Sequence, residues 1–336
     1  MELHPSISLK KLNTFGIDAI GNVAVVTEKD DIIRIANETG QSPTLILGGG
    51  SNLLFTKNPE GWIWKNELHG IEIADETDEF VWVKAGAGEN WHRFVLHCIE
   101  KNWGGIENLS LIPGLIGASP MQNIGAYGVE IKDVFHSLEA IDLSSGQLRT
   151  FTLQECKFGY RESVFKHEQK GKFMIASVTY RLRKKNHELK LDYGDIRKEL
   201  DIQGIPNPGI ADLSRAVIAI RSSKLPDPQV LGNAGSFFKN PVVSEDIEKH
   251  IREKYPELVA YPASAGMKKL AAGWLIEKAG WKGFRRGDAG VHSKQALVLV
   301  NYGKATGAEI WQLSEDIVRN VEDTFGVLLE REVNIL

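Results

Sequence analysis

The stretch Pro113-Gly-Leu-Ile-Gly-Ala-Ser-Pro-Met-Gln-Asn-Ile-Gly-Ala-Tyr-Gly128 contains four glycines, two prolines and no charged residue. This density of glycine and proline argues against a regular helix, and the residues do not alternate as they would in a strand. Apolar residues along the stretch predict a long loop held against the interior, whose backbone N–H groups need partners. Two interpretations remain open: a loop satisfied by its own side chains, or one that binds a ligand rich in hydrogen-bond acceptors.

A second glycine-rich segment, Gly48-Gly-Gly-Ser-Asn52, follows a predicted strand at Thr44–Leu47. Glycines directly after a strand allow the backbone to approach a phosphate closely, although a tight turn has the same pattern. The segment lacks the Lys-Ser/Thr of a Walker loop. Gly86-Ala-Gly88 comes nearest to the dinucleotide fingerprint, but Trp91 stands where its third glycine belongs. A Rossmann-type nucleotide turn is therefore excluded.

Periodicity predicts mixed α and β structure along the whole chain. Helices are expected where apolar residues recur at i, i+3, i+4 and i+7, and strands where β-branched and aromatic residues cluster or alternate. A Thr306–Glu309 capping box marks the start of one helix and Gly326 its end. The expected strands are 23–26, 44–47, 80–85, 138–143, 147–151, 173–183, 296–300 and 327–333, and the expected helices are 30–39, 89–101, 267–279 and 306–325.

Length and composition are those of an ordinary multidomain globular protein. The 336 residues carry a net charge of −4, so no electrostatic footprint for nucleic acid is present. We predict a cytoplasmic protein without a membrane segment or a metal site, because no long apolar run occurs and the two cysteines are far apart. Pro-rich linker signals at 205–208 and 225–228 support a division into residues 1–71, 72–220 and 221–326, with 327–336 returning to the first.

Single residues do not reveal a reaction. Arg161 and Glu332 have the pattern of exposed surface charges, and Ser236 lies outside any Gly-x-Ser-x-Gly elbow. The residues alone therefore indicate an α/β protein with two glycine-rich ligand loops and no identified chemistry.

Whole motifs, in contrast, resemble those of the UDP-N-acetylenolpyruvoylglucosamine reductase family, nearly end to end and in family order. The resemblance lies in Thr14–Gly16, Gly48–Asn52, Pro113–Gly128, Gly159–Ser163, Lys224–Pro228, Gly232–Pro241, Gly273–Glu277, Gln295–Val298 and Glu330–Val333. It implies an α+β protein with an FAD-binding fold of the vanillyl-alcohol-oxidase type, built from two α/β subdomains plus a C-terminal substrate-binding α/β domain. It also implies a monomer that acts in peptidoglycan precursor synthesis.

The reaction implied by the resemblance uses FAD and NADPH. A hydride passes from NADPH to flavin N5 and then to C3 of UDP-N-acetylglucosamine enolpyruvate, and a proton at C2 completes UDP-N-acetylmuramate. By this resemblance Ser236 donates that proton, Arg161 pairs with the substrate carboxylate, and Glu332, protonated or sharing a proton, polarises it. The implied FAD-binding residues are Thr14, Gly48, Gly49, Gly50, Ser51, Asn52, Pro113, Gly114, Gly117, Ala118, Ser119, Gln122, Asn123, Gly125, Ala126 and Gly128. The implied substrate-binding residues are Tyr160, Tyr193, Lys224, Asn240 and Gln295.

Two details refine the resemblance, and two other functions are open as alternatives. Tyr193-Gly-Asp195 resembles the type I branch, whose substrate is covered by a tyrosine-bearing loop, and Asn334 stands where relatives commonly carry arginine. One alternative is a flavoenzyme of the same fold that oxidises a small alcohol with oxygen. The other is a catalytically silent flavin- or nucleotide-binding protein. The joint presence of Ser236, Arg161 and Glu332 favours the reductase over both.

Overall fold

Segments from distant parts of the sequence build each of two compact units in the computed structural model, which describes residues 1–40 and 42–336. Unit 1 contains residues 1–7, 21–49 and 60–223, and unit 2 contains residues 8–20, 50–59 and 224–336. The boundaries predicted after residues 71 and 220 fall within β6 (Ile71–Glu76) and α5 (Ile210–Lys224). The division into three domains remains a prediction.

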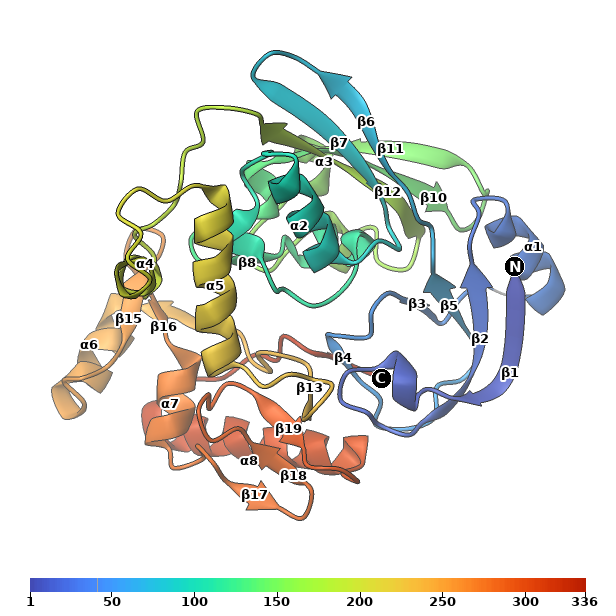
Figure 1. Cartoon of the computed structure of the whole chain (residues 1–336). Coiled ribbons are helices and arrows are strands. Elements are labelled where there is room, and N and C mark those ends of the chain that lie inside the picture. The colour runs from blue at the N-terminus through green and yellow to red at the C-terminus, as the bar shows by residue number, and fades with distance from the viewer. Residues whose placement is uncertain (41) are drawn as a thin grey trace. The chain divides into compact units, whose positions relative to one another are not determined.

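Two sheets form the framework of unit 1 (Figure 1). The strand order of the smaller sheet is β1 (Glu2–Ser8), β2 (Ile20–Val26), β5 (Trp62–Asn66) and β3 (Leu45–Leu47), with parallel β2–β5 and β3–β5 pairs. The larger sheet is antiparallel throughout, in the order β11 (Leu148–Thr152), β10 (Phe135–Asp142), β12 (Phe173–Arg183), β7 (Phe80–Gly86) and β6. Strands β10, β11 and β12 confirm the strands expected at 138–143, 147–151 and 173–183.

Helix α2 (Trp91–Glu100) covers one face of the five-stranded sheet and provides much of the core of unit 1. Trp91, Phe94, Val95 and Cys98 are buried against the inward-facing residues of β7 and β12. The side chain of Asn90 caps the helix by accepting from the Arg93 N–H. Burial raises the pKa of the Cys98 thiol, so this cysteine is an inert core residue.

The other helices of unit 1 are short, apart from α5. They are α1 (Asp31–Thr39), which ends at the left-handed Gly40 as predicted, α3 (Leu153–Cys156) and α4 (Ile196–Ile202). The sequence analysis missed α5, which packs Leu213, Ala216, Val217 and Ile220 against α4. It follows Pro206-Asn-Pro208, a pattern that by itself indicates only a linker.

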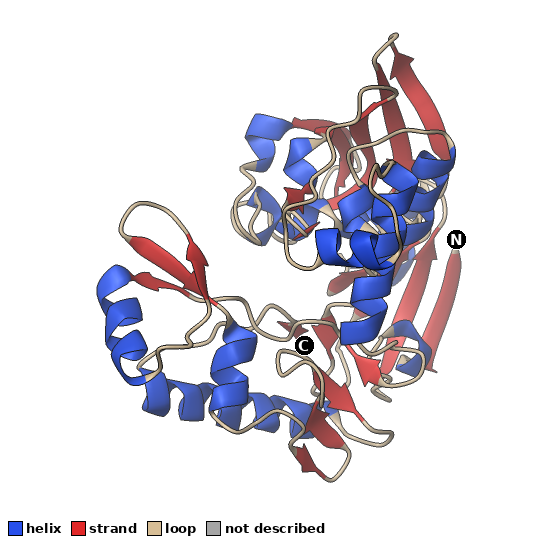
Figure 2. Cartoon of the chain, turned by 60° about the vertical axis from the view of Figure 1, so that its left-hand side comes forward, coloured by secondary structure: helices blue, strands red, loops and turns tan. Residues whose placement is uncertain are grey.

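Unit 2 combines two small sheets of three or four strands, the two-stranded pair of β4 (Leu53–Leu54) and β20 (Asn334–Ile335), and three α-helices, so strands and helices occur in both units (Figure 2). One sheet has the order β13 (Gly232–Asn233), β19 (Leu299–Asn301), β18 (Ala289–Val291), β17 (Arg285–Arg286), and the other β14 (Val242–Ser244), β16 (Met267–Leu270), β15 (Ala260–Pro262). The helices are α6 (Glu245–Lys254), α7 (Ala272–Lys278) and α8 (Gly307–Phe325). The predicted capping box at Thr306 and the Gly326 terminus of α8 are confirmed.

Three predicted elements of unit 2 need correction. Met267–Leu270 form β16 instead of a helix, because two neighbouring strands pair with them and override the helical spacing. The strand expected at 296–300 is β19, which begins only at Leu299. Residues 327–333 bury Val327, Leu329 and Val333 alternately, yet they form only the isolated bridge from Arg331 to Phe238. The last strand is instead β20 (Asn334–Ile335), which pairs in parallel with β4 (Leu53–Leu54).

None of the helices among the described residues is long and apolar enough to cross a membrane.

Candidate active site

The two glycine-rich segments meet within unit 1. A β-carbon placed on Gly49 would lie 3.2 Å from the Gly114 α-carbon, so backbone approaches backbone closely at this point, with the Leu115 side chain beside it. The 113–128 loop is also tied to the start of α2: Trp91 N–H donates to the Gly114 carbonyl at 3.1 Å, and Ile116 N–H donates to Glu89 O at 2.8 Å. Glycine is required at 117, where a β-carbon would lie 2.7 Å from that of Ala87. Tight backbone packing therefore positions the loop.

Some of the hydrogen-bonding groups of the 113–128 loop are paired with other groups of the protein itself. Asn123, fully buried, donates from Nδ2 to Glu130 Oε2 and to the Gly159 carbonyl, each at 3.0 Å, and accepts from Lys132 N–H. Ser119 shares a 2.7 Å hydrogen bond with the buried Tyr180 hydroxyl. These two side chains hold the loop together, so any contact of theirs with a cofactor would use the main chain. Short 3-10 turns at Ile116–Ala118 and Pro120–Gln122 complete this internal structure.

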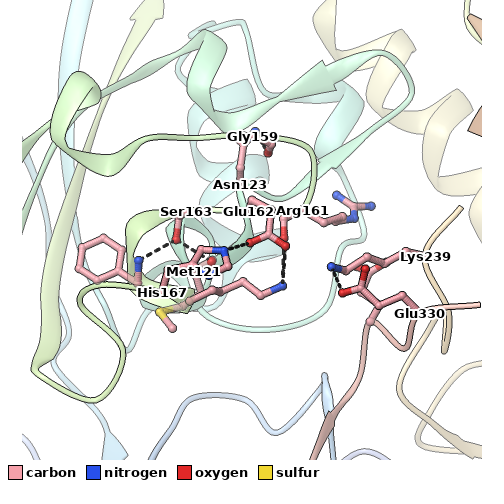
Figure 3. A network of polar contacts seen from close by, with 12 residues as sticks. Met121, Asn123, Gly159, Arg161, Glu162, Ser163, His167, Lys239 and Glu330 are labelled. Atoms are coloured by element: carbon pink, nitrogen blue, oxygen red, sulfur yellow. Dashed lines mark hydrogen bonds and ion pairs between the residues drawn. The ribbon is translucent and has the colours of Figure 1, made fainter. Parts of the chain in front are cut away.

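Arg161 lies at the tip of a tight turn that docks on the same loop (Figure 3). Gly159 and Glu162 exchange main-chain hydrogen bonds, which leaves Tyr160 and Arg161 at the tip, and Arg161 adopts a left-handed φ of 56°. Its guanidinium Nη2 donates to the Gly125 carbonyl at 3.0 Å. A non-glycine residue with positive φ stores strain and often marks a functional position. The structure thus brings together the 113–128 loop and the Tyr160-Arg161 motif.

Tyr193 lies against the end of the loop. Its ring makes an edge contact with Tyr127, with centroids 6.2 Å apart, and a β-carbon on Gly128 would lie 3.4 Å from it. The Tyr193 side chain is 48% exposed and Tyr160 is 38% exposed, as expected for aromatic groups available to a ligand. Both predicted substrate residues therefore border the loop.

The sequence analysis missed Arg221, a charged residue of unit 1 on helix α5. Its Nε atom is buried without a hydrogen-bond partner among the described residues. Burial lowers the pKa of Arg221; Tyr127 acts in the opposite direction, and the positive charge of Arg161 adds a smaller lowering effect. A guanidinium whose buried Nε atom lacks a hydrogen-bond partner is costly, so this site favours a bound anion. The signal was in the sequence: Arg221 follows Leu213, Val217 and Ile220 on the apolar stripe of a helix.

In unit 2, backbone pairing brings the predicted proton donor next to the predicted polarising carboxylate. Residues 237–239 run antiparallel to residues 330–332: Glu332 N–H donates to Phe237 O, and Lys239 N–H donates to Glu330 O, each at 2.8 Å. Ser236 directly precedes this pairing, and its hydroxyl makes no hydrogen bond within residues 1–40 and 42–336. The buried Lys239 ammonium forms an ion pair with Glu330 across the two segments (Figure 3).

Predicted substrate residues of unit 2 lie on segments adjoining this pairing. Phe237 N–H donates to Leu297 O at 2.8 Å, and Leu297 N–H in turn is 3.4 Å from Gln295 Oε1. Asn240 Oδ1 accepts from Ala272 N–H at 2.9 Å at the start of α7, so a ligand contact would use its amide nitrogen. Lys224 is exposed where α5 ends.

The remaining predicted cofactor residues, Thr14 and Gly50–Asn52, also lie in unit 2. Thr14 N–H donates to Gly50 O at 3.0 Å. Gly50 has a φ of 62°, and a β-carbon there would lie 2.0 Å from the Leu12 carbonyl oxygen, so no other residue fits. Asn52 Nδ2 donates to the Glu332 carbonyl at 3.2 Å, which links this turn to the Ser236–Glu332 pairing.

Comparisons with known proteins identify the class to which this fold belongs. Residues 18–152 match the FAD binding domain family, and residues 227–336 match the C-terminal domain of UDP-N-acetylenolpyruvoylglucosamine reductase. A crystal structure of the reductase from Thermus caldophilus shares the fold, with a TM-score of 0.67 and 22% identity over 100% of this chain and 99% of its own. The molecule is therefore an α+β flavoprotein with an FAD-binding fold of the vanillyl-alcohol-oxidase type.

Curated relatives define the family. The reductase of Flavobacterium johnsoniae is 51% identical over 100% of both chains, and that of Pseudomonas syringae pv. syringae is 51% identical over 100% of this chain and 99% of its own. The chain belongs to the UDP-N-acetylenolpyruvoylglucosamine reductase family, which is a family of oxidoreductases. The resemblance described from the motifs is thereby confirmed.

Proposed function

We propose that this protein uses NADPH to reduce UDP-N-acetylglucosamine enolpyruvate to UDP-N-acetylmuramate. The observation that carries the proposal is the antiparallel pairing of residues 237–239 with 330–332, which holds Ser236 and Glu332 together in unit 2. A silent flavin-binding protein would have no need of this arrangement. The relatives that are half identical to the chain are named for the same reductase.

The residues present fit FAD. Gly49 and Gly114 meet without side chains, and a β-carbon on Gly49 would occupy the space between them. Backbone of this kind can approach a pyrophosphate closely enough for N–H groups to donate to it. We infer that Gly48–Asn52 and the 113–128 loop hold the cofactor, with Thr14 supporting Gly50. When bound, FAD supplies the hydride that reaches the enolpyruvyl methylene carbon.

The chain's own residues complete the reduction by controlling charge and a proton. The hydroxyl of Ser236 donates its proton to C2, where negative charge develops once the hydride has been added. The guanidinium of Arg161 pairs with the substrate carboxylate and stabilises the same charge. Glu332 polarises that carboxylate. Arg221, a partly buried cation of unit 1 whose Nε atom is buried, provides a second positive charge for an anionic group of the ligands.

Substrate binding is assigned to Tyr160, Tyr193, Lys224, Asn240 and Gln295. Lys224 supplies the cation that a diphosphate requires, and the exposed Tyr193 covers the bound sugar nucleotide. We further propose a cytoplasmic monomer, because the substrates are soluble nucleotides. These assignments go beyond family membership.

An anaerobic absorbance titration tests the proposal. NADPH is added to the purified protein until the flavin bands bleach, and the enolpyruvyl substrate is then supplied. Return of the oxidised spectrum with loss of the enol ether supports the reductase. Bleaching without return would point to a different electron acceptor, and reoxidation only by oxygen would favour the alcohol-oxidase alternative. A protein without flavin would overturn the proposal altogether.

A further inference from the structure

The segment from Glu332 to Leu336 is hydrogen-bonded along its length to residues 52–56 of unit 2. Asn334 and Ile335 pair in parallel with Leu53 and Leu54. Leu336 N–H donates to Leu54 O at 2.9 Å, and Leu336 O accepts from Thr56 N–H at 2.7 Å and from its hydroxyl at 2.6 Å. Strands β4 and β20 thus form a clasp between the predicted cofactor turn and the predicted catalytic carboxylate.

Hydrogen bonds run in both directions between Asn52 and the segment that contains Asn334. The Asn52 carbonyl accepts twice from Asn334, from the main-chain N–H at 3.1 Å and from the side-chain Nδ2 at 2.9 Å. The Asn52 side chain donates back to the Glu332 carbonyl at 3.2 Å. The orientation of the Asn52 peptide and the position of Glu332 therefore depend on each other.

The Asn334 side chain has no packing role, because the residue is exposed. The side-chain amide instead contributes one hydrogen-bond donor to the Asn52 carbonyl. An aspartate has the same shape but, when ionised, only accepts hydrogen bonds, so it would repel the Asn52 carbonyl. This difference separates a hydrogen-bonding role from a steric one.

We propose that Asn334 is a positioning residue that couples the FAD-binding turn to Glu332, so that cofactor binding and proton delivery depend on one clasp. The inference rests on the proposed function. It assigns Asn334 no contact with cofactor or substrate: the residue acts through the Asn52 carbonyl and, by way of the Asn52 side chain, on Glu332.

The test measures two quantities on Asn334→Ala and Asn334→Asp. One is the FAD dissociation constant of the deflavinated protein, followed by quenching of flavin fluorescence. The other is the rate of each half-reaction by stopped flow. Loss of one net hydrogen bond predicts about fivefold weaker FAD binding and about fivefold slower reoxidation for Asn334→Ala. The effects of Asn334→Asp are larger, and reduction by NADPH in the saturated protein stays within about twofold of the wild type.

Controls separate this inference from the proposed function. Asn207→Ala, at an exposed loop position, changes neither quantity. In an Asn52→Ala background the Asn334→Ala change no longer slows reoxidation, because the Asn52 side chain carries the effect. Wild-type behaviour of Asn334→Asp in both measurements, while the wild type binds FAD and turns over, would overturn the clasp alone. A wild-type protein that fails to bind FAD or to be reoxidised would overturn the proposed function and the clasp with it.

Discussion

Ser236 is the residue whose role the structure makes easiest to test. Its hydroxyl is held beside the 237–239 and 330–332 pairing without a hydrogen bond to the described chain, so its removal leaves the backbone intact. We expect Ser236→Ala to retain FAD and to be reduced by NADPH at the wild-type rate. Reoxidation by the enolpyruvyl substrate should slow by about 10² to 10⁴, the usual loss for an acid catalyst. Stopped-flow measurement of both half-reactions checks this.

Ser236→Cys serves as the matched variant, since it restores a group that can donate a proton and should recover part of the rate. Equal slowing of both half-reactions in Ser236→Ala would remove the proton-donor role.

Replacing Arg221 should affect stability and turnover in opposite directions. Replacement by methionine removes a partly buried charge whose buried Nε lacks a partner among the described residues, so the protein without ligands should gain a few degrees in thermal midpoint. Turnover should fall by about tenfold or more, because an anionic ligand loses its counter-charge. Differential scanning calorimetry of the deflavinated protein and steady-state kinetics measure the two effects. Arg215→Met, on the exposed side of the same helix, is the control and should change neither, whereas a destabilised Arg221→Met would contradict the argument.

At this scale the sequence was informative only where residues form long motifs. Ser236, Arg161 and Glu332 could be nominated by resemblance, but nothing in their local pattern distinguishes them from surface residues. Arg221 could have been found as a charge on an apolar helical stripe, had α5 been predicted. The internal roles of Asn123 and Ser119 could not, because their partners Glu130, Gly159 and Tyr180 are set by tertiary structure.

Helix α8 allows a prediction about a single element, because a glycine marks each end. At Gly307 a β-carbon would lie 1.7 Å from the Phe55 carbonyl oxygen, whereas at Gly326 it would meet nothing within 4 Å. Gly326→Ala should therefore cost only the left-handed conformation, about 1–2 kcal/mol. Gly307→Ala must displace the backbone near residue 55 and should cost several kcal/mol. Urea unfolding of the two variants measures the difference, and equal losses would mean that the helix start can shift freely.

Elements with strong local signals were predicted well. The capping box of α8, the apolar stripe of α2 and the long apolar strand β12 each depend on their own residues. Met267–Leu270 was wrong because the helical spacing there is weaker than pairing with β14 and β15, which cannot be inferred from the segment alone. Buried and less buried residues alternate along 327–333 as in a strand, but the described neighbours form only the isolated Arg331–Phe238 bridge with them and no continuous strand pairing.

For the whole molecule, carboxyl groups with lowered pKa values predict loss of stability in acid. At Asp31 burial would raise the pKa, but hydrogen bonds from Thr27 and Glu28 outweigh it and keep the pKa below the usual range. The pKa values of Glu139 and Asp316 are lowered in the same way by lysine and arginine partners. The unfolded chain therefore binds more protons, so this stability is complete above about pH 5 and is lost as the pH falls below about 4.

Two partly buried histidines add a smaller loss of stability that begins at higher pH. Burial lowers the pKa of His92 and of His292, so protonation favours the unfolded chain below about pH 6.5. We expect the urea midpoint to fall slightly from pH 7 to 5.5 and steeply below pH 4.5. Asp31→Asn should lower the midpoint at pH 7, by about 1–2 kcal/mol in unfolding free energy, and converge with the wild type in acid. A gap that stays constant at all pH values would show that the Asp31 charge is not involved.

The clasp between β4 and β20 also has a consequence for how the protein is made. Unit 2 needs residues 8–20 and 50–59 as well as residues after 224, and Leu53 and Leu54 find their strand partners only at 334–335. On the ribosome, unit 1 has all its residues available once position 223 has emerged, while the early segments of unit 2 wait for synthesis of the rest. The cofactor turn at Gly50–Asn52 is therefore completed only after residues 334–335 have been synthesised, and flavin capture should follow that step.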